Sequence, residues 1–144
     1  MAMRPRVVLG CALFWTLGLA TEQARAADAG RFDGKWDVTL VCPGSPDGAL
    51  LFTFAFSANV ENGRLHGENG VAGQPGWMVL DGPIQPDGAA ALDARGLTGS
   101  APYNVNQTGR GVAYHHAVTA HFETTRGAGY WVTTRTCDFT FTRR

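Results

Sequence analysis

The stretch RFDGKWDVTLVC, residues 31–42, alternates apolar and polar side chains along most of its length. A second stretch, TRTCDFTFTRR at residues 134–144, alternates in the same way. A period of two residues is typical of a β-strand with one buried face and one exposed face. Each stretch contains one cysteine, Cys42 or Cys137, so together they predict two strands that a disulfide can join.

Pairing these strands antiparallel, with Cys42 opposite Cys137, fixes the register of the whole pair. Trp36 then faces Arg143, Val38 faces Phe141 and Leu40 faces Phe139. We therefore expect the first and last strands to close a barrel, with Arg143 beside the Trp36 ring in a cation–π contact worth about 0.5–2 kcal/mol. A disulfide that closes a loop of about 95 residues would add about 4–5 kcal/mol. The alternative is a coincidental alternation, with the cysteines paired across two sheets.

Residues 1–26 have the pattern of a signal peptide. A basic start at Arg4 and Arg6 precedes the apolar run VVLGCALFWTLGLA at residues 7–20, and Ala24-Arg25-Ala26 predicts cleavage before Ala27. The run is short for a bilayer span, so we expect no stable membrane anchor after cleavage. Cys11 lies within the run rather than at its end, which does not favour a lipoprotein. We expect a periplasmic or secreted protein.

Residues 27–144 suit one β-barrel domain with one core. Cleavage removes three of the twelve basic residues and one of the twelve acidic residues, which leaves a net charge of about −2. This balance gives no reason to expect a nucleic-acid partner or an anionic membrane. Cys42 and Cys137 are the cysteines that remain, and one intramolecular pairing is open to them, unless both stay as free buried thiols.

Strand and turn signals dominate the rest of the sequence. Further strands are predicted near residues 52–61, 64–68, 77–84, 89–95, 112–123 and 130–142. Turn signals lie at Asn62-Gly63, Pro46-Asp47-Gly48 and Pro86-Asp87-Gly88, and residues 96–111 form a long loop. We predict an all-β fold, an antiparallel up-and-down β-barrel of seven or eight strands, with a two-sheet β-sandwich as the alternative. The many aromatic residues on inward faces favour a mostly filled barrel with at most a shallow pocket at one mouth.

Gly34-Lys35-Trp36 on the first strand and a basic residue, Arg143 or Arg144, near the end of the last strand resemble the calycin superfamily. That superfamily includes lipocalins, avidins and small bacterial protease inhibitors. The resemblance implies that Trp36 packs at a closed barrel end under the basic side chain. The chain also resembles uncharacterised exported bacterial proteins that share F-D-G-x-W, P-G-W, L-D-G-x-I-x-x-D-G and a late C-x-x-x-F.

The histidines do not have the spacing of a metal site. His115 and His121 share one face of a predicted strand but lie about 20 Å apart, and His115 and His116 point to opposite faces. The sequence contains no Cys-x-x-Cys or His-Glu-x-x-His motif and no recognisable catalytic set. We therefore predict no metal, no cofactor and no enzymatic activity.

His116 shares the apolar face of its strand with Tyr114. If residues 112–123 and 130–142 form a hairpin, one register pairs Phe122 with Trp131, Val118 with Arg135 and His116 with Cys137. A buried Arg135 needs a partner, which an anionic ligand can supply. The alternatives are hydrogen bonds to loop carbonyl groups, or a register slip that exposes Arg135. The candidate ligand-binding residues are His116, Arg135, Tyr114 and Trp131.

These patterns favour an exported, non-catalytic binding module that takes a small molecule, with anions among the candidates, at the barrel mouth. The alternative is a protein-binding module such as an inhibitor of a secreted protease. A cavity of about 300 Å³ or more, lined by His116 and Arg135, would favour the small molecule. A filled core with an exposed aromatic patch near Trp77 or Tyr103 would favour the protein partner. The sequence leaves the oligomeric state open.

Overall fold

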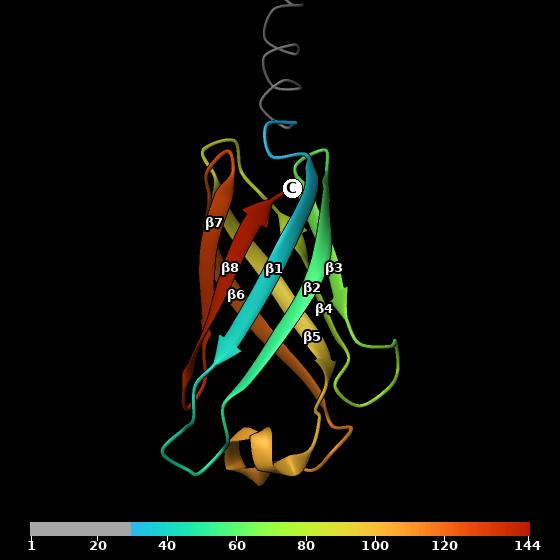
Figure 1. The fold of residues 1–144 in the computed structure, drawn as a ribbon, viewed down its shortest axis with the longest axis vertical. Helices are drawn as coiled ribbons and strands as arrows, with labels where there is room; N and C mark the ends of the chain where they lie inside the picture. The colour runs from blue at the N-terminus through green and yellow to red at the C-terminus, as the bar shows by residue number, and fades with distance from the viewer. Residues whose placement is uncertain (1–29) are drawn as a thin grey trace, which may run out of the picture.

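The computed structural model describes residues 30–144, and the predicted signal peptide lies outside the described residues. Residues 30–144 form a closed antiparallel barrel in which each strand pairs with the next and the last returns to the first (Figure 1). The sandwich alternative is therefore wrong. The eight strands are β1 (Gly34–Cys42), β2 (Phe52–Glu61), β3 (Arg64–Asn69), β4 (Met78–Pro83), β5 (Ala89–Leu97), β6 (Ala113–Phe122), β7 (Arg126–Val132) and β8 (Thr136–Arg143).

The long loop between β5 and β6 contains two short 3-10 turns, η1 (Ala101–Tyr103) and η2 (Val105–Gln107), which lie across one end of the barrel in Figure 1. Within residues 30–144, no helix has the length and apolar character needed to cross a membrane. The loop end of the barrel is called the open end below, and the opposite end, where β8 finishes, is called the closed end.

The predicted register between the first and last strands is confirmed. Trp36 lies opposite Arg143, Val38 opposite Phe141 and Leu40 opposite Phe139. The Cys42–Cys137 disulfide joins the two strands at the open end, across a sequence separation of 95 residues. Both cysteines are buried. They lie on the inward face of β1 and β8, together with four other buried residues: Val38, Leu40, Phe139 and Phe141. The strand-pairing rule therefore located the seam of the barrel from sequence alone.

The closed end is filled by aromatic side chains around Trp36, which has no exposed surface. Its indole Nε1 donates to the backbone oxygen of Phe32 at 2.9 Å, and its ring meets Phe122 edge-on at 5.3 Å. The Arg143 guanidinium lies 5.9 Å from the Trp36 ring. Gly34 adopts a φ of +134°, and a Cβ there would lie 3.5 Å from Arg143 Nε. The positive φ therefore favours glycine at this position, and a Cβ there would touch the arginine at an ordinary contact distance.

The predicted strand at residues 130–142 is wrong, because the chain reverses at residues 133–135 and divides it into β7 and β8. The predicted register between β6 and the following strand is also wrong. Phe122 faces Gly127 instead of Trp131, and Trp131 faces Cys137 across β7 and β8. The pairings of Val118 with Arg135 and of His116 with Cys137 fail with it.

Glycine explains this difference in register. A Cβ at Gly127 would lie 3.0 Å from Cδ1 of Phe122, so the missing side chain makes room for the phenyl ring. A Cβ at Gly129 would lie 2.7 Å from the Cβ of Ala120, its partner on β6. On this pair of strands the inward residues Ala120 and Phe122 of β6 therefore face glycines of β7, and they do not face other large apolar side chains.

The two ends of the barrel differ in how far the strands stay paired. The β2–β3 ladder stops at Ala58 and Gly67, and the β6–β7 ladder stops at Thr119 and Tyr130. Beyond these pairs the strands separate toward the open end. Three phenylalanines lie in the part of β2 that pairs with β1 but has no partner on β3, and they are consequently only half-buried: Phe52, Phe54 and Phe56. This separation leaves space between the walls at the open end.

Candidate functional site

A cavity of about 460 Å³ occupies the open end of the barrel. The closed half is filled as the sequence predicted, but the open half is roomier than the shallow pocket expected from the aromatic content. The cavity is lined by residues of β1, β2, β5, β6, β7 and β8, of the 98–112 loop, and of the loops that contain Gly76 and Arg135. All four residues predicted as ligand-binding candidates line it together: Tyr114, His116, Trp131 and Arg135.

Three rings form one wall of the cavity. Tyr114 and His116 are two residues apart on β6, so they share its inner face, and their rings stack at 5.2 Å with an interplanar angle of 24°. The His116 ring also meets Trp131 of β7 at 4.9 Å. These contacts bridge the region where β6 and β7 are no longer paired. The wall is therefore flat, apolar and aromatic, with polar atoms at the Tyr114 and His116 edges.

The polar atoms of this wall have no partner within residues 30–144. No hydrogen bond joins the Tyr114 hydroxyl or either His116 ring nitrogen to the described part of the chain. Burial raises the pKa of Tyr114 to about 12, so the residue stays a phenol. Burial, and secondarily the charge of His115, lowers the pKa of His116, so its imidazole is neutral at pH 7. Both groups can therefore donate to or accept from a bound molecule.

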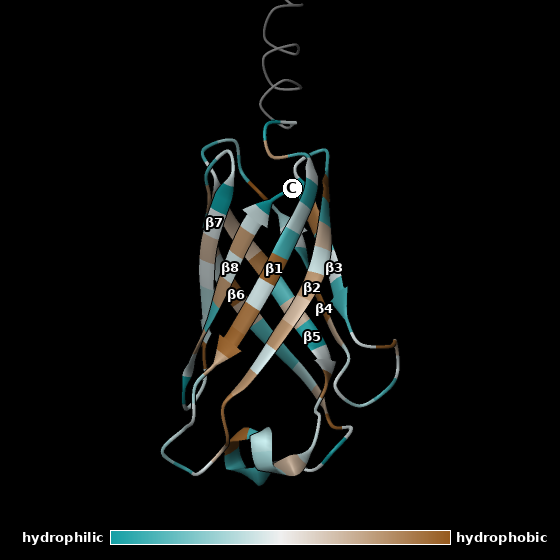
Figure 2. Ribbon diagram, viewed as in Figure 1, coloured by the Kyte–Doolittle hydropathy of each residue, from teal (hydrophilic) through white to brown (hydrophobic). Residues whose placement is uncertain are grey.

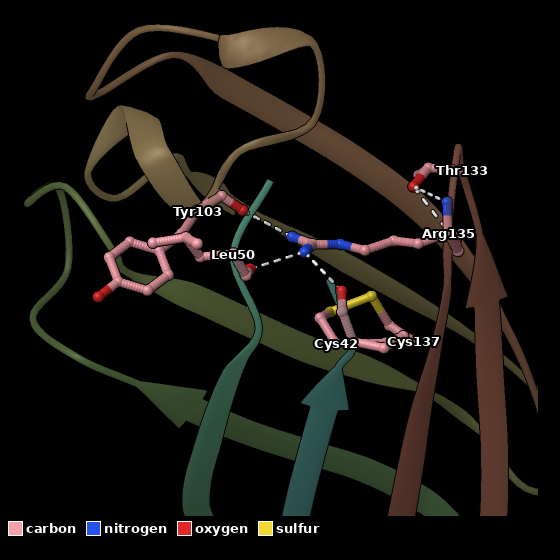
Figure 3. The surroundings of a disulfide bond; sticks show 7 residues. Cys42, Leu50, Tyr103, Thr133, Arg135 and Cys137 are labelled. Atoms are coloured by element: carbon pink, nitrogen blue, oxygen red, sulfur yellow. Dashed lines mark hydrogen bonds between the residues drawn. A yellow bond between two sulfur atoms is a disulfide. The ribbon is translucent and has the colours of Figure 1, made fainter. Parts of the chain in front are cut away.

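Arg135 holds the loops of the open end together (Figure 3). Its Nη1 donates to the backbone oxygens of Pro43 at 2.8 Å and Leu50 at 2.9 Å, and its Nη2 donates to that of Tyr103 at 2.6 Å. The guanidinium also lies 5.0 Å from the Phe52 ring. Only 8% of the residue is exposed. One alternative drawn from the sequence was that Arg135 donates hydrogen bonds to loop carbonyl groups. The structure shows these hydrogen bonds, and they reach two different loops.

The charge of Arg135 has no salt-bridge partner within residues 30–144, where no carboxylate oxygen lies within 4 Å of it, and the more distant Asp47 carboxylate acts on it only at longer range. Desolvation by burial lowers the pKa of Arg135, but a guanidinium remains a cation in proteins. No Asp or Glu is among the described residues that line the cavity. The site therefore has a positive electrostatic bias, although three N–H groups of the arginine are already engaged.

Sequence reasoning missed part of the lining. The side chains of Phe52 and Phe54 face the cavity instead of a filled core, because β3 ends before it reaches them. The 98–112 loop contributes small and polar residues, and Asn104 organises it by donating to the backbone oxygens of Gly99 and Thr108. The available signal was the length of this loop, since long loops in compact domains are often functional.

The remaining histidines lie outside this site. His115 and His121 are exposed on the outer face of β6, and His115 contacts Asp93 of β5 at 2.8 Å. Within the described chain, no three His, Cys, Asp or Glu residues are grouped closely enough to hold a metal ion. The cavity offers apolar contact, the hydrogen-bonding groups of Tyr114 and His116, and a nearby cation, which together suit binding.

Comparison with known proteins gives no match: no family model, no curated protein and no solved structure matches this chain. The functional proposal therefore rests on the geometry of the cavity and on the chemistry of its lining.

Proposed function

We propose that this chain is an exported, non-catalytic binding module of calycin-like form that holds a small molecule in the cavity at its open end. The observation that carries the proposal is the cavity itself. A volume of about 460 Å³ lies in the usual range for small-molecule sites, and the lining combines apolar walls with a few polar groups. The closure of the barrel around Trp36, Gly34 and Arg143 supports the calycin-like assignment, and the disulfide suits an oxidising compartment.

The lining favours a ligand with a planar, mostly apolar body. Such a body can lie against the rings of Tyr114, His116 and Trp131 and under those of Phe52 and Phe54. The ligand also needs a polar group that reaches the free Tyr114 hydroxyl or the His116 imidazole, because filling the cavity otherwise strips these groups of water without compensation. A neutral or anionic polar group fits best, since the lining contains a cation and no carboxylate.

Native mass spectrometry of the protein purified from its own periplasm or medium tests the proposal directly. The expected spectrum shows the oxidised chain together with a non-covalent adduct that disappears on denaturation, and the difference gives the ligand mass. A chain that is oxidised but bare would contradict tight retention of a ligand through purification. It would leave the cavity to be tested with an added probe.

Titration with the anionic fluorophore anilinonaphthalene sulfonate supplies that second test. We expect binding at the cavity, with about a tenfold weaker Kd for Trp131→Leu and a smaller loss for His116→Gln. His115→Gln is the matched control, because His115 neighbours His116 but lies on the outer face. Equal effects of the two histidine substitutions would place the probe outside the cavity and contradict the proposal.

The second candidate function is a protein-binding module such as an inhibitor of a secreted protease. The feature that favours it is the loop between β1 and β2, where Leu50 and Leu51 are 51% and 58% exposed. Stoichiometric inhibition of an extracellular protease, lost on Leu51→Ser and kept on Trp131→Leu, would support this function in place of the first. Inhibition that is absent, or equally sensitive to both substitutions, would count against it.

A further inference from the structure

The exposed apolar side chains of this barrel are concentrated at one end. Eight large hydrophobic residues of the described chain are exposed, and we call them the apolar rim: Val41, Leu50, Leu51, Val71, Tyr103, Val112, Tyr130 and Val132. Five lie in the loops of the open end, and three lie on the outer faces of β1 and β7 next to it. Figure 2 shows that β1 becomes more hydrophobic toward the open end, where Val41 is exposed while Leu40 and Cys42 are buried.

The closed end has a different surface. Its connecting segments, residues 30–33, 62–63, 84–88 and 123–125, contain four charged residues: Arg31, Asp33, Asp87 and Glu123. None of the exposed large hydrophobic residues of the described chain lies there. Single apolar residues scattered over a surface are ordinary, but their collection around one opening marks an interaction site. The rim surrounds the mouth of the cavity, so the two features share one face of the molecule.

The charge of the open end is small. Its loops, residues 43–51, 70–77, 98–112 and 133–135, contain three charged residues: Asp47, Arg110 and Arg135. Arg135 is turned inward onto backbone carbonyls. The opposite charges of Asp47 and the exposed Arg110 nearly cancel. The rim therefore lacks the basic cluster that anionic lipids attract. Its charge complements an uncharged or zwitterionic surface.

The residue types of the rim distinguish a lipid surface from a protein partner. Six of the eight are valine or leucine, which are under-represented among the energetic centres of protein–protein interfaces. They are also distributed over three loops and two strands around a hollow, so they do not form one packed patch. A fluid lipid interface can accept such separate side chains at a shallow depth.

We propose that the apolar rim docks this protein onto a zwitterionic lipid surface, with the mouth of the cavity facing the lipid. The proposal does not rest on the identity of a ligand, or on there being one. It also fixes an orientation. The first described residues lie at the closed end, away from the docked face, because the backbone oxygen of Arg31 accepts a hydrogen bond from Arg143 at the end of β8.

Hydrogen exchange of the full chain, with and without phosphatidylcholine vesicles, tests the orientation. We expect slower exchange in residues 49–52, 70–73 and 102–112 when vesicles are present, and no change in residues 84–88 and 123–125. The bound fraction should change little between low and high salt, because the contact is apolar. Protection of the closed end alone would mean attachment through the preceding segment and would overturn the proposal. An unchanged exchange pattern would overturn it as well.

Substitution of the rim provides the second measurement. Leu51→Ser with Val71→Ser should lower vesicle binding at least fivefold, whereas the matched pair Ala91→Ser and Ala128→Ser, on exposed strand positions toward the closed end, should leave it unchanged. Equal binding by the two double variants would overturn the proposal. Concentration-dependent protection of the rim loops without vesicles would identify a second copy of the chain as the occupant, and would overturn the lipid assignment.

Discussion

Arg135 and Arg143 stand at the two ends of β8, and each donates hydrogen bonds to three backbone carbonyl oxygens from distant segments. Arg135 binds those of Pro43, Leu50 and Tyr103 at the open end. Arg143 binds those of Arg31, Asp33 and Thr124 at the closed end. One strand therefore fastens the loops at both ends of the barrel with the same chemical group.

Substitution of Arg135 should loosen the open end. Arg135→Met removes three charge-assisted hydrogen bonds from a nearly buried group, so we expect the free energy of unfolding to fall by about 2–4 kcal/mol. Arg135→Lys should recover part of this, since an ammonium group keeps the charge but not the planar fork. Urea unfolding measures the change. We expect faster hydrogen exchange in residues 98–112 and an unchanged rate in residues 123–125, which would assign the loss of stability to the open end. Equal changes in exchange at both ends would argue against this role of Arg135.

Adjacent arginines at the closed end should behave differently. Arg143→Met removes the cation over Trp36 and three hydrogen bonds, and we expect a loss of about 2–4 kcal/mol in the free energy of unfolding. Arg144→Met serves as the control, because Arg144 pairs with Asp37 on an exposed surface and should matter little. Thermal unfolding of both variants compares them. Similar midpoints would show that Arg143 does not close the barrel.

The two Pro-Asp-Gly turns should respond unequally to the same substitution. Gly48 and Gly88 have φ angles of +92° and +93°, so alanine is strained at both. A Cβ at Gly48 meets nothing within 4 Å, whereas one at Gly88 would lie 2.1 Å from the backbone oxygen of Phe122. We expect Gly48→Ala to cost about 1–2 kcal/mol and Gly88→Ala at least twice as much. Urea unfolding of the two variants measures both losses in the free energy of unfolding. Equal losses would contradict the difference in packing around the two glycines.

His116 should make stability depend on pH. Burial lowers its pKa in the folded chain, whereas the unfolded chain has a histidine with the ordinary value of about 6.5. Below that value the unfolded chain takes up a proton that the folded chain binds less readily, so the free energy of unfolding decreases as the pH falls from 7 to 5. His116→Gln should remove this pH dependence of the free energy of unfolding. His115→Gln should keep most of it, because burial is the larger cause of the lowered His116 pKa and the charge of His115 is the smaller one. Urea midpoints at several pH values test this, and identical slopes for the two variants would refute it.

The seam of the barrel could be predicted because two cysteines fixed its register. Once Cys42 and Cys137 were placed opposite each other, every inward partner followed, and the structure has the same pairs. The Asn62-Gly63 turn was predictable for a related reason. Both residues have positive φ angles, 51° and 71°, which the sequence pair is known to favour.

The β6–β7 register could not be predicted from the same logic. The predicted hairpin places Phe122 opposite Trp131, yet Phe122 faces Gly127, whose missing side chain gives its ring space. The reversal at residues 133–135 was hidden too, since Thr-Thr-Arg contains none of the usual turn residues. Long-range contacts of Arg135 with loops about 30 to 90 residues away hold that reversal in place.

The candidate site was predictable in its residues but not in its volume. Tyr114, His116, Trp131 and Arg135 share inward positions, and alternation alone reveals that. The cavity arises because β3 is short and because β6 and β7 separate toward the open end. The alternation of apolar and polar residues in a strand does not predict where its pairing with a neighbour ends. The aromatic count of the whole chain therefore overestimated how full the open half is.

The pairing of β1 with β8 has a consequence for how this chain acquires its structure. The bridge that locks the seam spans 95 positions, and proteins dominated by such distant contacts fold slowly. Until residues 136–143 are available, β1 and β7 each present an edge without a neighbour, and the interior stays accessible. If the chain is exported through a channel with its amino end first, as proposed, the barrel can close only after residues 136–143 have crossed.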